Sequence, residues 1–178
     1  MKCKCFDEIV TFNPSDTFYI RLNKSKCGCT SRFTVNEKKS SFSIRCNSIK
    51  LVDKYKIDGY FDKNTAHKKC DYLFVYHHSN KETIIFVELK GKDINEAVKQ
   101  LENTVSIFNS EQFFQRMNSF ELFGAIVSTG YPADDATFRK LKKGICAKFK
   151  KYNLQIENKK FRMRYDPKRN KFLGMNEK

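Results

Sequence analysis

No apolar run in this sequence approaches the roughly 20 residues that a membrane-spanning helix needs. The opening Met1-Lys2-Cys3-Lys4-Cys5 leads into polar residues rather than into the apolar segment of a signal peptide. Linkers and internal repeats, which would divide the chain, are also absent. We therefore expect a single cytoplasmic domain without a membrane partner, and its length is sufficient to bury a real core.

Cysteine is present, but not in the pattern of a disulfide-stabilised protein. The total of seven is odd, which argues against a disulfide framework in a cytoplasmic chain. Two close pairs could supply four thiolates to a structural zinc ion, although their C-x-C spacing is tighter than the usual C-x₂-C: Cys3 with Cys5, and Cys27 with Cys29. Zinc stays open as an alternative to the favoured reading, which is reduced and unconnected thiols. Cys70 and Cys146 lie beside apolar runs and are expected in the core.

Tryptophan is absent, glycine is scarce with seven residues, and lysine is abundant. Lysine and arginine number 35 against 20 aspartates and glutamates, so the formal net charge is +15 and the pI is about 9.5. An AT-rich genome would enrich lysine for no functional reason, which weakens the argument from charge without removing it. The remaining excess indicates a polyanionic partner such as nucleic acid.

The most informative stretch, residues 69–90, predicts a β-hairpin. Two runs rich in β-branched and aromatic residues, 69–76 and 83–90, flank a polar turn. With the turn centred between Ser79 and Asn80, antiparallel pairing sets Asp71 opposite Glu88, and it sets residues 74 and 75 opposite 85 and 84. Side chains alternate along a strand, so Glu88 and Lys90 point to one side and Leu89 to the other. The hairpin thus gathers two acids and a lysine at one end of an apolar sheet.

The two acids stand in an apolar setting. Both strands are apolar on both faces, which predicts a central pair covered on each side. Carboxylates held side by side repel each other, and one is pushed toward protonation unless a cation lies between them. Oxygen ligands of this kind suit Mg²⁺ or Mn²⁺. The alternative is that Asp71, Glu88 and Lys90 are three solvated charges at strand ends.

A helix is predicted directly after the hairpin. Asp93 is placed to cap its first turn, and Glu96 occupies the capping-box position. An apolar stripe at helical spacing follows: Ile94, Ala97, Val98, Leu101, Val105 and Phe108. Gln100 lies at the edge of this stripe, where it either approaches the acids or faces solvent.

Asp71, the hairpin, Glu88-x-Lys90 and the following helix together resemble the PD-(D/E)xK nuclease superfamily, which has the restriction-endonuclease-like fold. The resemblance covers the hairpin and helix, and more loosely residues 50–160; Cys70 stands where the motif's name has proline. It implies metal-dependent hydrolysis of phosphodiester bonds in nucleic acid, DNA before RNA. One alternative is a module on the same fold that binds nucleic acid without cutting it. Another is a scaffold protein whose basic helix binds an acidic partner.

The same resemblance implies a role for each residue of the site. Asp71, Glu88 and the main-chain carbonyl of Leu89 would hold one or two Mg²⁺ or Mn²⁺ ions, which lower the pKa of a bound water. Lys90 would orient that water and offset negative charge as the phosphate is attacked. Gln100 occupies a position where several families of the superfamily carry a glutamine. Some members bring a further metal-binding acid from an N-terminal helix, and the candidates here are Asp7, Glu8 and Glu37.

Lysines near the hairpin and on a second predicted helix, residues 134–152, are candidates for contacts with a phosphate backbone. They are Lys68, Lys69, Lys92, Lys142 and Lys143. Solvated surface charge is the alternative for each of them. A homodimer is compatible with cutting two strands, although the sequence names no interface.

The predicted order from residue 49 is three strands, a helix, a strand, a second helix and a closing pair of strands near 154–157 and 161–165. We therefore expect an α/β single domain over residues 1–178, with a central mixed sheet flanked by helices in a restriction-endonuclease-like arrangement. Residues 49–165 form its core and 166–178 a frayed basic tail. Residues 1–48 predict little beyond strands at 18–22 and 41–46.

Overall fold

The computed structural model describes residues 32–45, 52–57, 68–77, 81–110, 120–130, 153–169 and 171–174, together with residues 136, 139, 140 and 143. Several sequence predictions fall outside these ranges: the strand at 18–22, the acids Asp7 and Glu8, Lys142, and every cysteine except Cys70. No helix among the described residues is long and apolar enough to cross a membrane.

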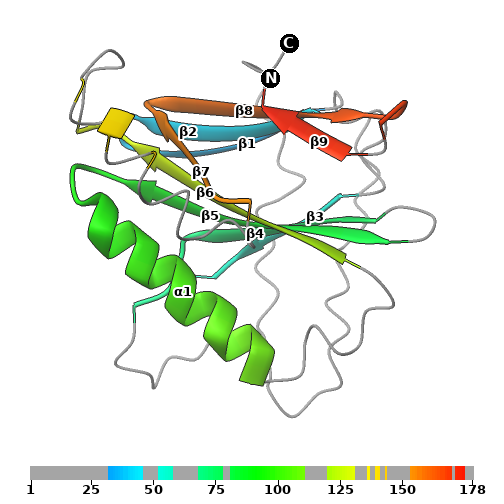
Figure 1. Ribbon diagram of the computed structural model, residues 1–178, viewed down its shortest axis with the longest axis horizontal. Coiled ribbons are helices and arrows are strands. Elements are labelled where there is room, and N and C mark those ends of the chain that lie inside the picture. The colour runs from blue at the N-terminus through cyan, green and yellow to red at the C-terminus, as the bar shows by residue number, and fades with distance from the viewer. Residues whose placement is uncertain are drawn as a thin grey trace.

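The described elements are nine strands and one long helix (Figure 1). In chain order they are β1 (Arg32–Glu37), β2 (Ser40–Arg45), β3 (Val52–Lys56), β4 (Tyr72–His77), β5 (Glu82–Lys90), α1 (Ile94–Ser110), β6 (Phe120–Ser128), β7 (Gln155–Asn158), β8 (Lys160–Asp166) and β9 (Lys171–Gly174). They form two mixed sheets, so the chain is an α/β protein.

The predicted hairpin is the middle of a five-stranded sheet with the order β3-β4-β5-β6-β7. Strands β4 and β5 pair antiparallel, with Phe74 opposite Ile85 and Val75 opposite Ile84, which confirms the predicted register. β5 then pairs in parallel with β6, and β6 in parallel with β7. Residues 83–89 of β5 are all buried, as expected for a central strand covered on both faces.

Helix α1 covers one face of this sheet (Figure 1). Its predicted stripe is buried, with Ile94, Ala97, Leu101 and Phe108 all less than 7% exposed. These side chains pack against alternate residues of the strands beneath them: Leu73, Val75, Ile84, Phe86, Ile126 and Ile156. Phe86 and Phe108 meet edge to face, with their ring centroids 5.3 Å apart.

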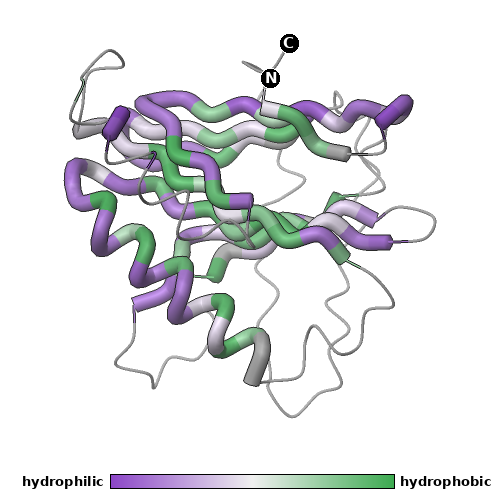
Figure 2. The backbone as a smooth tube through the Cα atoms, in the orientation of Figure 1, coloured by the Kyte–Doolittle hydropathy of each residue, from purple (hydrophilic) through white to green (hydrophobic). Residues whose placement is uncertain are grey.

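A second sheet, with the order β1-β2-β8-β9, covers the other face (Figure 1). Its inner side chains pack on the strand residues that point away from α1, and Phe42 at the centre contacts both Phe74 and Phe161 with centroid distances of 5.5 Å. Figure 2 shows long apolar stretches in the central strands of the five-stranded sheet, whereas apolar and hydrophilic residues alternate along the strands of the second sheet. Of the helices expected to flank the sheet, α1 covers one face, and β strands form the layer on the other; most of the second predicted helix, residues 134–152, lies outside the described residues.

Two further predictions about the C-terminal part need correction. β7 and β8 are strands, as expected, but they are not a pair: β7 joins β6 in one sheet and β8 joins β2 in the other. Within the segment 166–178, expected to be a frayed tail, β9 pairs with β8 and buries Phe172 and Leu173. The turn between them is closed by Asp166, whose Oδ1 accepts hydrogen bonds from the Lys168 and Arg169 amides at 2.9 and 3.2 Å.

Candidate active site

The strand ends that carry the predicted site meet at one edge of the molecule, on the left in Figure 1. β5 and β6 are parallel and both end there, at Lys90 and Ser128. β4 runs the opposite way, so its beginning, next to Asp71, lies at the same edge. This topology brings Asp71 beside the end of β5, as the hairpin register predicted.

Asp71 is held against the backbone of β5. Its Oδ2 accepts a hydrogen bond from the Leu89 amide at 2.6 Å. The N–H and C=O of one strand residue point to the same side of the strand, so the Leu89 carbonyl is directed toward Asp71 as well. The side chain of Leu89 is buried between the two sheets, which leaves its backbone as the part that faces the site.

Glu88 is the most perturbed group of the site. Its side chain is 3% exposed. Its Oε1 lies 3.8 Å from Lys90 Nζ, and its Oε2 is buried without a hydrogen-bond partner among the described residues. Burial, and next the negative charge of Asp71, raise the pKa of Glu88 from 4.5 to about 8, although Lys90 opposes this rise. A cation bound beside this carboxylate would favour its ionised form and so offset both effects.

Lys90 is fixed by Gln100 of α1. The ammonium group donates a hydrogen bond of 2.6 Å to Gln100 Oε1. The amide nitrogen of Gln100 donates in turn to the Lys69 carbonyl at 3.4 Å. Gln100 is buried, so the structure places it beside the acids and not in solvent, the two alternatives that the sequence left open.

The start of α1 is anchored as the capping residues predict. Asp93 Oδ1 accepts a hydrogen bond from the Glu96 amide at 2.9 Å. The carboxylate of Glu96 lies 3.3 Å from Lys68 Nζ, which links the helix to the segment before β4. A stronger link is buried: the Cys70 amide donates to Thr104 Oγ1 at 2.8 Å, and that hydroxyl donates to the Gln100 carbonyl at 2.7 Å.

Thr104 is a residue of this arrangement that the sequence analysis missed. It lies one helical turn after Gln100 and binds the residue immediately before Asp71, so it helps to set the distance between α1 and the acids. The signal in the sequence was a polar residue on the apolar stripe of the helix. Only the fold shows that Thr104 bonds to the amide of Cys70, 34 positions earlier in the chain.

The end of β5 is hydrogen-bonded to residues of both sheets. Thr129 N–H bonds to the carbonyls of Lys90 and Gly91 at 3.1 and 3.0 Å, and Ser40 Oγ reaches the Lys90 carbonyl at 3.4 Å. Gly130 lies so close to Lys92 that an added Cβ would stand 2.5 Å from the Lys92 Cα. The backbone that presents Lys90 is therefore closely packed on the side away from Asp71.

The predicted backbone-binding lysines have different environments. Lys68 and Lys92 are exposed at this edge, and Lys143 is exposed in a helical position. Lys69 is only 6% exposed, so its side chain is not on the open surface where a phosphate contact was predicted. The backbone of residues 68–70 is hydrogen-bonded to side chains of α1, an arrangement that the local sequence could not show.

The residues present offer a small set of metal ligands. No group of three or more His, Cys, Asp or Glu side chains in the described part of the chain is placed to hold a metal ion. Asp71 and Glu88 supply two carboxylates, and the Leu89 carbonyl faces the same side. Glu37 ends β1, and its negative charge helps to raise the pKa of both Glu88 and Tyr72, so it lies within electrostatic reach of the site. The partnerless oxygen of Glu88 and its raised pKa fit a cation at this place.

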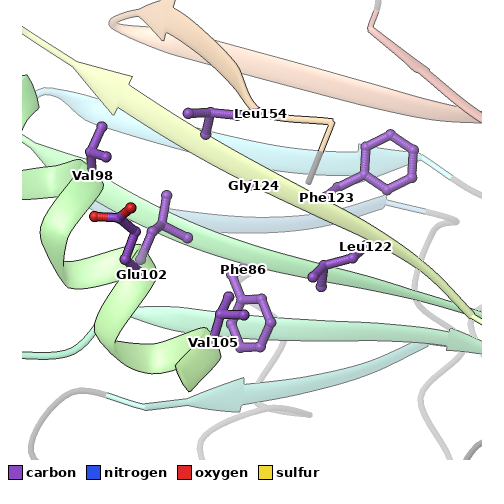
Figure 3. Close-up of a pocket in the computed structure, with 9 residues that line it drawn as sticks. Phe86, Val98, Glu102, Val105, Leu122, Phe123, Gly124 and Leu154 are labelled. Atoms are coloured by element: carbon purple, nitrogen blue, oxygen red, sulfur yellow. The ribbon is translucent and has the colours of Figure 1, made fainter. Parts of the chain in front are cut away.

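An apolar pocket lies elsewhere, between α1 and β6 (Figure 3). Its walls include Phe86, Val98, Leu122 and Leu154, and Gly124 leaves space because it has no side chain. Glu102 is the charged residue that borders it. A pocket with this lining offers little to a charged substrate, so the edge that carries Asp71 and Glu88 is the candidate site.

Comparison of the chain with models of protein families, with curated proteins and with solved structures finds no match. The resemblance to PD-(D/E)xK nucleases accordingly remains a prediction, and function has to be argued from the site itself.

Proposed function

We propose that this protein is a metal-dependent nuclease that hydrolyses phosphodiester bonds of nucleic acid, DNA before RNA. The observation that carries the proposal is the buried Oε2 of Glu88, which has no hydrogen-bond partner among the described residues. The β4–β5 register sets Asp71 beside Glu88, and Lys90 follows two residues later in β5. Lys90 offsets the charge of this pair of acids only in part, and a bound cation would favour the ionised form of both. The net charge of +15 supports a polyanionic substrate.

Each residue has a role in this proposal. The carboxylates of Asp71 and Glu88 and the Leu89 carbonyl would hold Mg²⁺ or Mn²⁺. Such an ion, when bound, lowers the pKa of a coordinated water and stabilises negative charge on the phosphate. Lys90 has donors left beyond its bond to Gln100, since an ammonium carries three, and these would orient the attacking water and the phosphate oxygen. Gln100 acts through Lys90 and is a positioning residue.

The competing function is a module that binds nucleic acid without cutting it. The observation in its favour is that two acids, and not a cluster of three, are found among the described residues of the site. In that case Asp71 has a structural role, since its bond to the Leu89 amide would hold the end of the hairpin. Metal-dependent cleavage separates the two functions.

The test is cleavage of plasmid and single-stranded DNA with Mg²⁺ or Mn²⁺, comparing wild type with Glu88→Gln and Lys90→Ala. The chain contains a matched control, because Lys81 and Glu121 form a 3.1 Å ion pair at the opposite end of the same sheet and Glu121 also has a buried oxygen without a hydrogen-bond partner among the described residues. Glu121→Gln and Lys81→Ala therefore change the same residue types away from the site. We expect a loss of cleavage of about 10²-fold or more in the site variants and little change in the controls.

Equal cleavage by wild type and Glu88→Gln would remove Glu88 from the site, or indicate a contaminating nuclease. Tight binding without cleavage by wild type would favour the binding module. Folding is checked for every variant by its urea midpoint, so that lost activity is not confused with lost structure.

A further inference from the structure

Two lysines in this protein have a backbone conformation that lysine seldom adopts. Lys38, in the turn between β1 and β2, has φ of 48°, and Lys159, between β7 and β8, has φ of 59°. This left-handed region is favoured by glycine and tolerated by asparagine, and other side chains are strained in it. Asn153, the remaining non-glycine residue of this kind in the described ranges, belongs to the tolerant type. Because this backbone conformation is unfavourable for lysine, its occurrence at two lysines indicates a functional role for their side chains.

The two turns lie side by side at the edge of the candidate site. The Ser41 amide donates to the Lys159 carbonyl at 2.9 Å, and the Lys159 amide donates to the Ser128 carbonyl at 2.7 Å. Ser40 Oγ in turn reaches the carbonyls of Val127 and Lys90. A continuous hydrogen-bonded path therefore runs from both strained turns to the backbone of Lys90.

These turns also concentrate positive charge. Lys38 and Lys39 follow one another in the first turn, Lys159 and Lys160 in the second, and Lys92 stands between Lys90 and the start of α1. All five are exposed, and no ion pair joins any of them to an acid within the described residues. We name these five residues the lysine rim. Glu37, which precedes Lys38, is an acid at the same edge.

We propose that the lysine rim binds the phosphodiester backbone of nucleic acid on either side of the phosphate that is cleaved. This inference rests on the proposed function, because it places the substrate beside Asp71 and Glu88. Lysine presents a point charge and not the planar fork of arginine, so the rim reads phosphate charge and not base sequence. The Lys38 turn lies within the second sheet and the Lys159 turn joins the two sheets, which gives the second sheet a role in substrate binding beyond covering the core.

The test measures binding of a short labelled DNA duplex in EDTA, where metal-dependent cleavage does not occur, across about 50 to 200 mM salt. The variants are Lys38→Gly, Lys159→Gly and the double variant. Glycine suits the left-handed backbone of both turns, so these substitutions remove the charge while the fold is kept. Thermal midpoints are expected to be unchanged or higher than that of wild type.

Two controls match the two changes. Asn153→Gly alters a left-handed residue whose side chain binds the Leu122 carbonyl near the start of β6, away from the rim. The Lys168→Ala/Arg169→Ala variant removes the same two positive charges as the double variant, but from the β8–β9 turn at the opposite end of the second sheet. Neither control is expected to weaken binding by more than about twofold, the residual long-range effect of net charge.

Each rim lysine that contacts a phosphate should contribute about 0.9 to the slope of log affinity against log salt, which is about eightfold in affinity per tenfold change in salt. We therefore expect the double variant to lose about 2 from this slope, with the same loss on unrelated duplex sequences. An unchanged slope in the double variant, an equal loss in the charge control, or no DNA binding by wild type would each overturn the proposal. Cleavage is assayed separately, so failure of the nuclease proposal would appear as wild-type binding without cleavage, with rim variants still weakened.

Discussion

The metal-free protein should become less stable as the pH rises from 5 to 8, and Glu88 should be the cause. In the unfolded chain this carboxyl titrates near its ordinary pKa of 4.5, whereas burial and Asp71 raise the pKa in the folded state to about 8. Between these values the folded state keeps a proton that the unfolded state releases. Stability contributed by that proton is present at low pH and is lost as the pH rises toward 8.

The size of the effect follows from the two pKa values. One proton bound only by the folded state gives a slope of about −1.4 kcal/mol per pH unit, so the free energy of unfolding should fall by up to about 4 kcal/mol between pH 5 and 8. Solvent screening reduces this little, because the Glu88 side chain is 3% exposed. Glu88→Gln keeps the volume of the side chain and removes the titration.

The assay is urea denaturation in EDTA at several pH values, comparing wild type with Glu88→Gln. When the free energy of unfolding of one protein is subtracted from that of the other, the contributions of groups that titrate in both proteins cancel. We expect the free energy of unfolding of Glu88→Gln to rise relative to that of wild type as the pH increases to 8. Glu121→Gln retains Glu88, so its free energy of unfolding should fall with pH as that of wild type does. Asp71→Asn should lose less stability between pH 5 and 8 than wild type does, because it removes the neighbouring charge that raises the pKa of Glu88.

Mn²⁺ provides a second measurement on the same group. A metal ligand has to lose its proton, so added Mn²⁺ should stabilise wild type more at pH 8 than at pH 6 and should stabilise Glu88→Gln little at either pH. A difference between wild type and Glu88→Gln that stays flat from pH 5 to 8 would refute the reasoning, because Glu88 would then not be the buried, proton-binding acid that its surroundings indicate.

Two structural features near the site give further predictions. Gly130→Ala should destabilise the protein by about 1–3 kcal/mol and lower cleavage, because the new Cβ meets the backbone of Lys92; Gly91→Ala, which meets nothing within 4 Å, should do neither in the same urea and cleavage assays. Thr104→Val should cost about 1–3 kcal/mol, since it leaves the buried Cys70 amide without its acceptor. Thr104→Ser keeps the hydroxyl and should lose about 1 kcal/mol at most, so an equal loss in both variants would contradict this role for the hydrogen bond.

Much of the candidate site could be predicted from the sequence because its contacts are local. The β4–β5 register follows from turn length and the alternation of apolar residues, which places Asp71 beside Glu88. The helix and its Asp93 cap follow from residues within one turn of each other, and the apolar stripe shows which face of α1 is buried. These interactions join residues fewer than 20 positions apart.

Tertiary structure alone decided what covers the second face of the sheet. β2 and β8 pair in parallel although about 120 residues separate them, and no local pattern in either strand specifies that partner. The same pairing brings the turns of Lys38 and Lys159 together next to Lys90. The burial of Lys69 is likewise a property of the folded chain and not of its local sequence.

The sequence by itself therefore determined the hairpin, the helix and the type of residue at the site, since short-range periodicity and turn chemistry are encoded within a few residues. The second sheet, the burial of the Glu88 carboxyl group and the lysine rim depend on contacts between distant segments. Such contacts form only when the whole apolar core is buried, and their effect on pKa and charge cannot be assigned before that geometry is known.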